Sequence, residues 1–179
     1  MRKFSLQIII YILLLAAPIT AAAQEGEGDT ADPTQSAIDS LLSLIKPNTP
    51  DSTKARLYKE MAELAVNADS IKKYAQLSLQ FCSDDDVKLV VRNNQLTCFA
   101  YYNNGDYDSS MIYLKRNVEL CSKADLTPQL SRSYRNIAAI YEARNVSDST
   151  FAYLNKALDI CVKTKDTSNI TIYIQIYWL

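Results

Sequence analysis

Helical faces built on one spacing recur three times along the chain. Between residues 58 and 65, four apolar side chains follow one another at i, i+3, i+4 and i+7, which places them on one face of a helix. The same face positions return in residues 94–101 and 134–141. Each copy has a small residue at its third face position: Ala62, Cys98 and Ala138. The pattern therefore predicts three amphipathic helices of one kind.

A second kind of segment follows each of these helices. It begins at an Asp-Ser pair, has a tyrosine one turn later and a cysteine two turns further on. The three copies lie about 40 residues apart. Their markers are Asp69, Tyr74 and Cys82, then Asp108, Tyr113 and Cys121, then Asp148, Tyr153 and Cys161. A recurrence of this length is typical of stacked supersecondary units, so we expect an all-α fold, an α-solenoid of helix-turn-helix repeats with a period of about 40.

Proline and capping residues give the expected boundaries. A short helix over 37–45, ended by Pro47 and Pro50, would form an N-terminal lid on the stack. Asp51 and Thr127 are expected N-caps, and Pro128 suits the first helical position. The ranges expected for the array are repeats at about 51–83, 84–123 and 126–165, and a partial repeat at 166–179, all within a solenoid of 37–179.

The N-terminus has the pattern of a secretory signal peptide over residues 1–23. Arg2 and Lys3 precede an apolar stretch, and small residues follow it before Gln24. We expect 24–36 to be a disordered linker, because it lacks large apolar residues. These features predict an exported, periplasmic protein with no membrane span in the mature chain. The alternative is a chain tethered to the membrane by an uncleaved N-terminal segment.

Charge and cysteine placement narrow the function classes. The net charge is −1, and loss of the two basic residues of the N-terminal segment brings it to about −3. No basic stripe suited to phosphate contacts is present, which argues against nucleic-acid binding. Cys82, Cys121 and Cys161 occupy one repeat position, so they should lie a full repeat apart, further than a disulfide spans. Buried free thiols are the preferred interpretation of the four cysteines.

The residues that catalysis commonly needs are scarce. The chain has no histidine, which removes the commonest general base and the Ser-His and Cys-His nucleophile arrangements. The cysteines show no C-x2-C spacing of a zinc site. The three acids at 84–86 could be viewed as metal ligands, but carboxylates at a helix N-terminus are stabilised without an ion. We therefore expect no enzyme, no cofactor and no metal.

Residues 131–160 resemble a tetratricopeptide (TPR) repeat. Ala138 and Tyr141 match the small and aromatic positions of the family's first helix, and Tyr153-Leu154-x2-Ala157-Leu158 matches its second-helix signature. The similarity extends over about 51–165, with a longer period than usual and Asn117 in place of the second-helix alanine. Longer variants of this kind are similar to exported or periplasmic regions of bacterial sensor proteins.

The resemblance implies a non-catalytic scaffold in the bacterial envelope that binds a protein or peptide. The alternative is an N-terminal sensor fragment of a longer membrane-bound regulator. In the family, the concave surface is lined by first-helix residues that lie off the core face. Carried onto this chain, these are Lys59, Glu63, Arg92, Gln95, Phe99, Tyr102, Arg132, Arg135 and Glu142. The arginines would favour an acidic ligand, with Phe99 and Tyr102 as apolar anchors.

The C-terminal residues suggest self-association. Residues 170–179 are strongly apolar, with isoleucine alternating with threonine, tyrosine and glutamine. Taken alone, the alternation is typical of a strand, but the repeat context favours the first helix of a further pair. Such a helix would have no successor to cover it. We expect association of copies through 170–179, or a continuation of the array in a longer protein.

Overall fold

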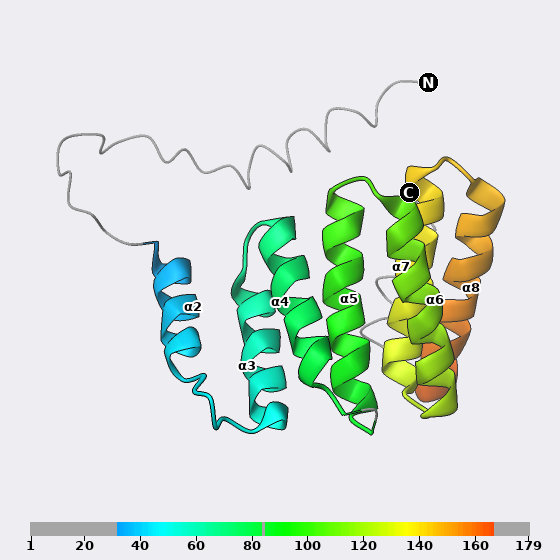
Figure 1. The fold of residues 1–179 in the computed structure, drawn as a ribbon. Coiled ribbons are helices and arrows are strands. Elements are labelled where there is room, and N and C mark those ends of the chain that lie inside the picture. Colours follow the sequence, from blue (N-terminus) through cyan, green and yellow to red (C-terminus); the bar gives the residue numbers. More distant parts are fainter. Residues whose placement is uncertain (1–31, 84, 167–179) are drawn as a thin grey trace, which may run out of the picture. The chain divides into compact units, whose positions relative to one another are not determined.

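The computed structural model describes residues 32–83 and 85–166. The expected signal peptide, most of the expected linker, the self-association segment at 170–179 and nearly all of the partial repeat lie outside the described residues. The described part contains helices and no strand. Its elements, shown in Figure 1, are α2 (Pro33–Ser43), α3 (Asp51–Leu64), α4 (Ala68–Phe81), α5 (Val87–Asn103), α6 (Tyr107–Lys123), α7 (Thr127–Ala143) and α8 (Ser147–Thr164).

The helices form three consecutive pairs, α3–α4, α5–α6 and α7–α8, that fall within the three expected repeats. Each described helix packs on its neighbour in sequence. The first helices α3, α5 and α7 also contact one another from pair to pair, whereas no such contact joins α4, α6 and α8 within the described part. This connectivity is that of an α-solenoid in which the first helices form the inner layer.

The lid helix α2 begins earlier than its expected start at Ala37. Asp32 is the N-cap and its carboxylate accepts a hydrogen bond from the Thr34 amide at 3.0 Å. Pro33 takes the first helical position, where no amide hydrogen is needed. Residues 33–36, expected in the linker, are therefore helical because an Asp-Pro pair starts a helix. Ile38 anchors α2 on α3 with 4% of its surface exposed.

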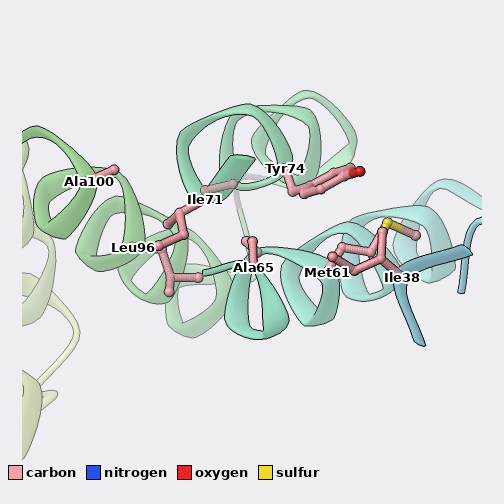
Figure 2. Packing of buried hydrophobic residues seen from close by; sticks show 9 residues of the cluster. Ile38, Met61, Ala65, Ile71, Tyr74, Leu96 and Ala100 are labelled. Carbon is pink, nitrogen blue, oxygen red and sulfur yellow. The ribbon is translucent and has the colours of Figure 1, made fainter. Parts of the chain in front are cut away.

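The face positions form the core. In the first pair, Ile38, Met61, Ala65, Ile71 and Tyr74 pack with residues from α5 in one apolar cluster (Figure 2). The small residues expected at the helix crossings, Ala62, Cys98 and Ala138, are all buried. Apolar burial contributes about 25 cal/mol per Å², so these shared interfaces are the main stabilising term of the array.

Tyrosine pairs join the two helices of a repeat at equivalent places. Tyr101 of α5 stacks on Tyr113 of α6 at 5.8 Å between ring centroids. Tyr141 of α7 stacks on Tyr153 of α8 at 5.6 Å. In the first pair Ala65 stands at the position of Tyr101, and it is the extended residue that ends α3. The first pair is built from helices of 14 residues, shorter than the 17 or 18 residues of the helices in the other two pairs.

A buried polar contact also recurs at equivalent positions. The Ser78 hydroxyl of α4 donates to the Ala55 carbonyl of α3 at 2.6 Å, and the Asn117 amide of α6 donates to the Val91 carbonyl of α5 at 3.0 Å. In the third pair the partners exchange roles. There Ser131 of α7 donates to the carbonyl of Ala157 on α8 at 3.1 Å. These contacts fix Ala55, Val91 and Ser131 as equivalent residues of the three first helices.

Left-handed residues end four of the helices at intervals of about 20 residues. They are Gly105, Asp125, Asn145 and Lys165, with φ between 52° and 74°. After each of them the next amide donates to a carbonyl five residues earlier, at 2.9 Å, as in a Schellman cap. Gly105 adopts this conformation without steric cost, because it has no Cβ. Asp125 and Lys165 show that L residues meet the same demand here, at a modest backbone cost.

Two expected N-caps lie one residue further on than their helices require. Pro50 and Leu126 are the N-caps, so that Asp51 and Thr127 are the first helical residues. Asp51 still lies in the first turn, where its charge is favourable. The third pair keeps its proline in the first turn of α7. Asp86 caps α5 by accepting a hydrogen bond from the Leu89 amide at 3.3 Å.

All four cysteines are free thiols, as expected. Cys98, Cys121 and Cys161 are buried, whereas Cys82 is only half-buried because it follows the end of α4 instead of lying within it. Burial raises the pKa of the Cys121 thiol to about 11. The Cys98 sulfur lies 3.1 Å from the Ser110 hydroxyl, and Cys161 lies 3.1 Å from Ser131. These thiols pack as small apolar side chains with weak polar partners.

Candidate functional site

The candidate site is the inner surface, which we define as the side of α3, α5 and α7 that faces away from α4, α6 and α8. One face of each first helix is fixed because it packs in the core and against the second helices. The side chains between these faces then turn outward at helical spacing. The sequence-predicted binding residues all lie on these three helices, three of them on α7, four on α5 and two on α3.

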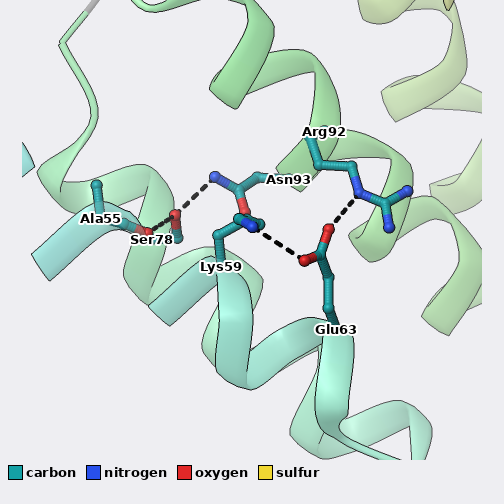
Figure 3. Close-up of polar contacts among 6 residues, drawn as sticks. All are labelled: Ala55, Lys59, Glu63, Ser78, Arg92 and Asn93. Atoms are coloured by element: carbon teal, nitrogen blue, oxygen red, sulfur yellow. Dashed lines mark hydrogen bonds and ion pairs between the residues drawn. The ribbon is translucent and has the colours of Figure 1, made fainter. Parts of the chain in front are cut away.

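At the junction of the first two pairs, three predicted residues form an ion-pair network. The Arg92 Nε donates to Glu63 Oε1 at 2.7 Å, and the Lys59 Nζ donates to Glu63 Oε2 at 2.9 Å (Figure 3). Burial alone would raise the pKa of Glu63, but the two hydrogen bonds and positive charges outweigh it and hold that pKa below its usual value. Glu63 is therefore ionised at neutral pH and joins α3 to α5.

A second, buried network joins α5 to α4 and α3. The Asn93 amide donates to the Ser78 hydroxyl at 2.7 Å, and Ser78 in turn donates to the carbonyl of Ala55 (Figure 3). Asn93 and Ser78 are fully buried. Together the two networks attach the first pair to the second. They fix how α5 is positioned along α3, and this places Arg92 beside Glu63.

An apolar pocket opens between the second and third pairs. It has a volume of about 180 Å³ and is lined by Cys98, Phe99 and Tyr102 of α5, Ser110 of α6, and Asn136 and Ala139 of α7. Phe99 is 52% exposed, an unusual state for a phenylalanine in the middle of a helix. Tyr102 is held by a tilted contact with Tyr107 at 5.4 Å. The pocket can receive an apolar side chain of a partner.

Cationic groups lie on the α7 side of this pocket. Arg132 is one turn before Asn136 and two turns before Ala139, so the three share a face of α7. Arg132 is exposed and Arg135 is half-buried. Within the described part of the chain neither of them forms an ion pair, in contrast to Arg92. Glu142 is exposed near the end of α7.

Gln95 is the predicted residue whose placement differs most from expectation. It is buried, with 7% of its surface exposed, and its Nε2 has no hydrogen-bond partner among the described residues. Three other side chains on α5 also have an unpartnered buried polar atom: Asn93, Asn94 and Thr97. Helix α5 therefore has an exposed aromatic side chain, Phe99, and several buried polar side chains. The periodicity of the sequence alone did not predict which of its residues are exposed and which are buried.

Three inner-surface residues were absent from the prediction. Arg56 is exposed on α3 and follows Ala55, as Arg92 follows Val91 and Arg132 follows Ser131. Because Ala55, Val91 and Ser131 are equivalent, the three arginines occupy one repeat position. Arg56 could have been found by aligning the three first helices on Ala55, Val91 and Ser131. Asn136 and Ala139 could be assigned only once the pocket was seen.

Other openings lie elsewhere on the described part, one of them of about 210 Å³ at the turn between α7 and α8, lined by Glu142, Phe151 and neighbouring residues. A wider opening of about 770 Å³ lies between α2 and α3, lined mainly by Leu41, Leu44, Leu64 and neighbouring serines and glutamates. No group of three or more His, Cys, Asp or Glu side chains suited to a metal occurs among the residues that the structure describes. Nor does any helix in those residues have the length and hydropathy to cross a membrane.

Among comparisons with known proteins, only the one with solved structures bears on the fold. No protein-family model matches the chain, and no curated protein matches it. Among solved structures, the chain is similar to the one described as the crystal structure of the apo form of RapI, with 15% sequence identity and a TM-score of 0.56. The match covers 74% of this chain and 48% of the RapI chain. The protein is thus an all-α, TPR-like helical-repeat solenoid.

Proposed function

We propose that the chain is a non-catalytic scaffold whose inner surface binds an extended segment of a partner protein. The observation that supports this best is the pocket between α5 and α7, in which Phe99 is half exposed and whose α7 wall at Asn136 follows Arg132 by one helical turn. An aromatic side chain that stays exposed in a pocket, near guanidinium groups that form no ion pair in the described part of the chain, is typical of a protein-binding site.

Position-specific crosslinking tests this function. A photoreactive phenylalanine analogue at position 99 should form covalent adducts in the cells that produce the protein. The matched control is position 151, where Phe151 of α8 is similarly exposed, at 48%, but on a second helix. Adducts that form from 99 and not from 151 support the proposal. Equal yields from both positions, or none from 99, contradict it.

Charge reversal provides the second test. Arg132→Glu with Arg135→Glu should weaken binding of the crosslinked partner, most strongly at low salt, where Coulomb attraction is least screened. Arg92 is a poorer choice because Glu63 already neutralises it. Circular dichroism should stay helical, since neither arginine belongs to the core. Unchanged binding at low salt would move the site off the inner surface.

We further propose that the protein acts in the bacterial envelope after export, most simply in the periplasm. The support is the basic, apolar and small-residue succession in residues 1–23. Cell fractionation with an antibody against the chain decides the location. Recovery in the periplasmic fraction with loss of residues 1–23 supports export and cleavage, recovery in membranes indicates an uncleaved tether, and recovery in the cytosol contradicts export.

A further inference from the structure

The junction between the first two pairs and the junction between the last two are built on equivalent residues. The buried contacts of Ala55, Val91 and Ser131 align the first helices. Counting four residues on from each gives Lys59, Gln95 and Arg135, and counting eight gives Glu63, Phe99 and Ala139. The arginine that follows each aligned residue completes the set. Each junction can therefore be compared position by position.

At the first junction a carboxylate is already in place. Glu63 accepts hydrogen bonds from Lys59 of its own helix and from Arg92 of the next first helix, and both distances are below 3.0 Å. Two donors on neighbouring first helices thus converge on one carboxylate (Figure 3).

At the second junction the donors are present without the acid. Gln95 stands where Lys59 stood, and Arg132 stands where Arg92 stood. Phe99 replaces Glu63, so among the described residues no carboxylate supplies the acceptor at this position. Arg132 forms no ion pair in the described part, and the Nε2 of the 7%-exposed Gln95 is unpartnered. The exposed Arg132 guanidinium is the donor that an external acceptor can reach directly, whereas the buried Gln95 Nε2 becomes available only when the Gln95 side chain turns outward. An unpaired buried donor is unfavourable, so an acceptor that also satisfies it contributes to binding.

We infer that the Gln95–Arg132 position is a binding site for a glutamate side chain of the partner segment, which would take the place that Glu63 occupies one junction earlier. The pocket formed by Phe99, Tyr102, Asn136 and Ala139 starts one helical turn further along both helices, since Phe99 follows Gln95 and Asn136 follows Arg132 by four residues. It would accept an apolar side chain close to the glutamate. This inference rests on the proposed function, because it names the chemistry of the segment bound at the same surface. An extended strand rises about 3.3 Å per residue, so the two groups should lie within about three residues of each other.

The first experiment needs no partner. Phe99→Glu places a carboxylate at the Glu63-equivalent position, and a double-mutant cycle with Arg132→Gln measures its coupling in urea unfolding. The expected coupling changes the unfolding equilibrium constant about two- to fivefold, the range of exposed ion pairs. Phe151→Glu combined with Arg132→Gln is the matched control and should show none. Additive effects of Phe99→Glu and Arg132→Gln would overturn the inferred site.

The second experiment identifies the ligand chemistry. A random phage-displayed library of blocked, internal peptide segments is panned against the full chain and against Arg132→Gln. Glutamate near a large apolar residue should be enriched on the native chain at least about tenfold over Arg132→Gln. Arg116→Gln, an exposed arginine on α6, is the control and should enrich as the native chain does.

The outcomes separate this inference from the proposed function. Peptides enriched without an acidic residue, or equally on Arg132→Gln, would leave peptide binding intact and overturn the glutamate site. Enrichment of no peptide on any variant would count against peptide binding itself, while the double-mutant cycle would still decide whether the position accepts a carboxylate.

Discussion

Asn117 of α6 donates its side-chain amide to the backbone carbonyl of Val91 on α5 at 3.0 Å. Its own Oδ1 accepts a hydrogen bond from Asn94 at 2.9 Å. Asn117 is fully buried and stands where TPR-like repeats have an alanine, a position held by Ala157 in the third pair. Asn117, which departs from the repeat pattern, therefore forms a buried hydrogen-bond network between the two helices of the second pair.

Replacing Asn117 tests how much this hydrogen-bond network stabilises the fold. Asn117→Ala removes the side-chain donor to the Val91 carbonyl and leaves the buried Asn94 amide without its partner, so it should cost about 1–3 kcal/mol in urea unfolding. Adding Val91→Ser recreates the Ser131–Ala157 arrangement of the third pair and should recover part of that loss. Asn103→Ala, an exposed position at the end of α5, serves as the control. If the double variant loses more unfolding free energy than the two single variants lose together, the contacts of the second and third pairs are not interchangeable.

The core position of Ala138 allows a sharper test. Ala138 is 1% exposed between α7 and α8. Ala138→Arg buries an uncompensated charge, which should lower the free energy of unfolding by about 3–5 kcal/mol. The same substitution at Ala152, exposed on α8, should change it by less than about 0.5 kcal/mol. Equal unfolding midpoints for the two variants would mean that the helical face is misassigned.

Acid should release the tie between the first two pairs. The folded-state pKa of Glu63 lies below its ordinary value of 4.5, so its contribution is complete at pH above that value and is lost as pH falls through the folded pKa. Glu63→Gln should cost roughly 0.5 kcal/mol at pH 7, because the pair is partly exposed. The difference from the native chain should shrink towards pH 3. A gap of constant size across this range would contradict the assignment.

Thiol reactivity should follow burial. Titration under denaturing, non-reducing conditions should detect four thiols. In the native state Cys82 should react first, because it is half-buried. Cys121, with a pKa of about 11, should be roughly a thousandfold depleted in thiolate at pH 8 and react last. Two or fewer thiols after denaturation would reveal a disulfide formed on export, which the free cysteines of the structure argue against.

The sequence was sufficient for the architecture because that architecture is local and repeated. Spacing of the face positions predicted the helices, and the recurrence of Asp-Ser, Tyr and Cys predicted their stacking. Periodicity could not predict the start of α2 at Pro33, where a single Asp-Pro pair decides, nor the half-exposure of Cys82, where α4 ends one residue earlier.

The inner surface was predicted as a set of positions, and only tertiary structure gave those positions different roles. Arg92 and Arg132 are equivalent in sequence, yet the first is paired with Glu63 and the second has Phe99 at the corresponding place. Gln95 looks like a surface residue in the repeat pattern, yet it is buried in the folded chain. The sequence by itself determined which side chains leave the helix on which face, because a helix fixes that locally. What neighbouring helices place opposite each side chain, and hence which charges are satisfied and which are left for a partner, was decided by the packing of residues far apart in the chain.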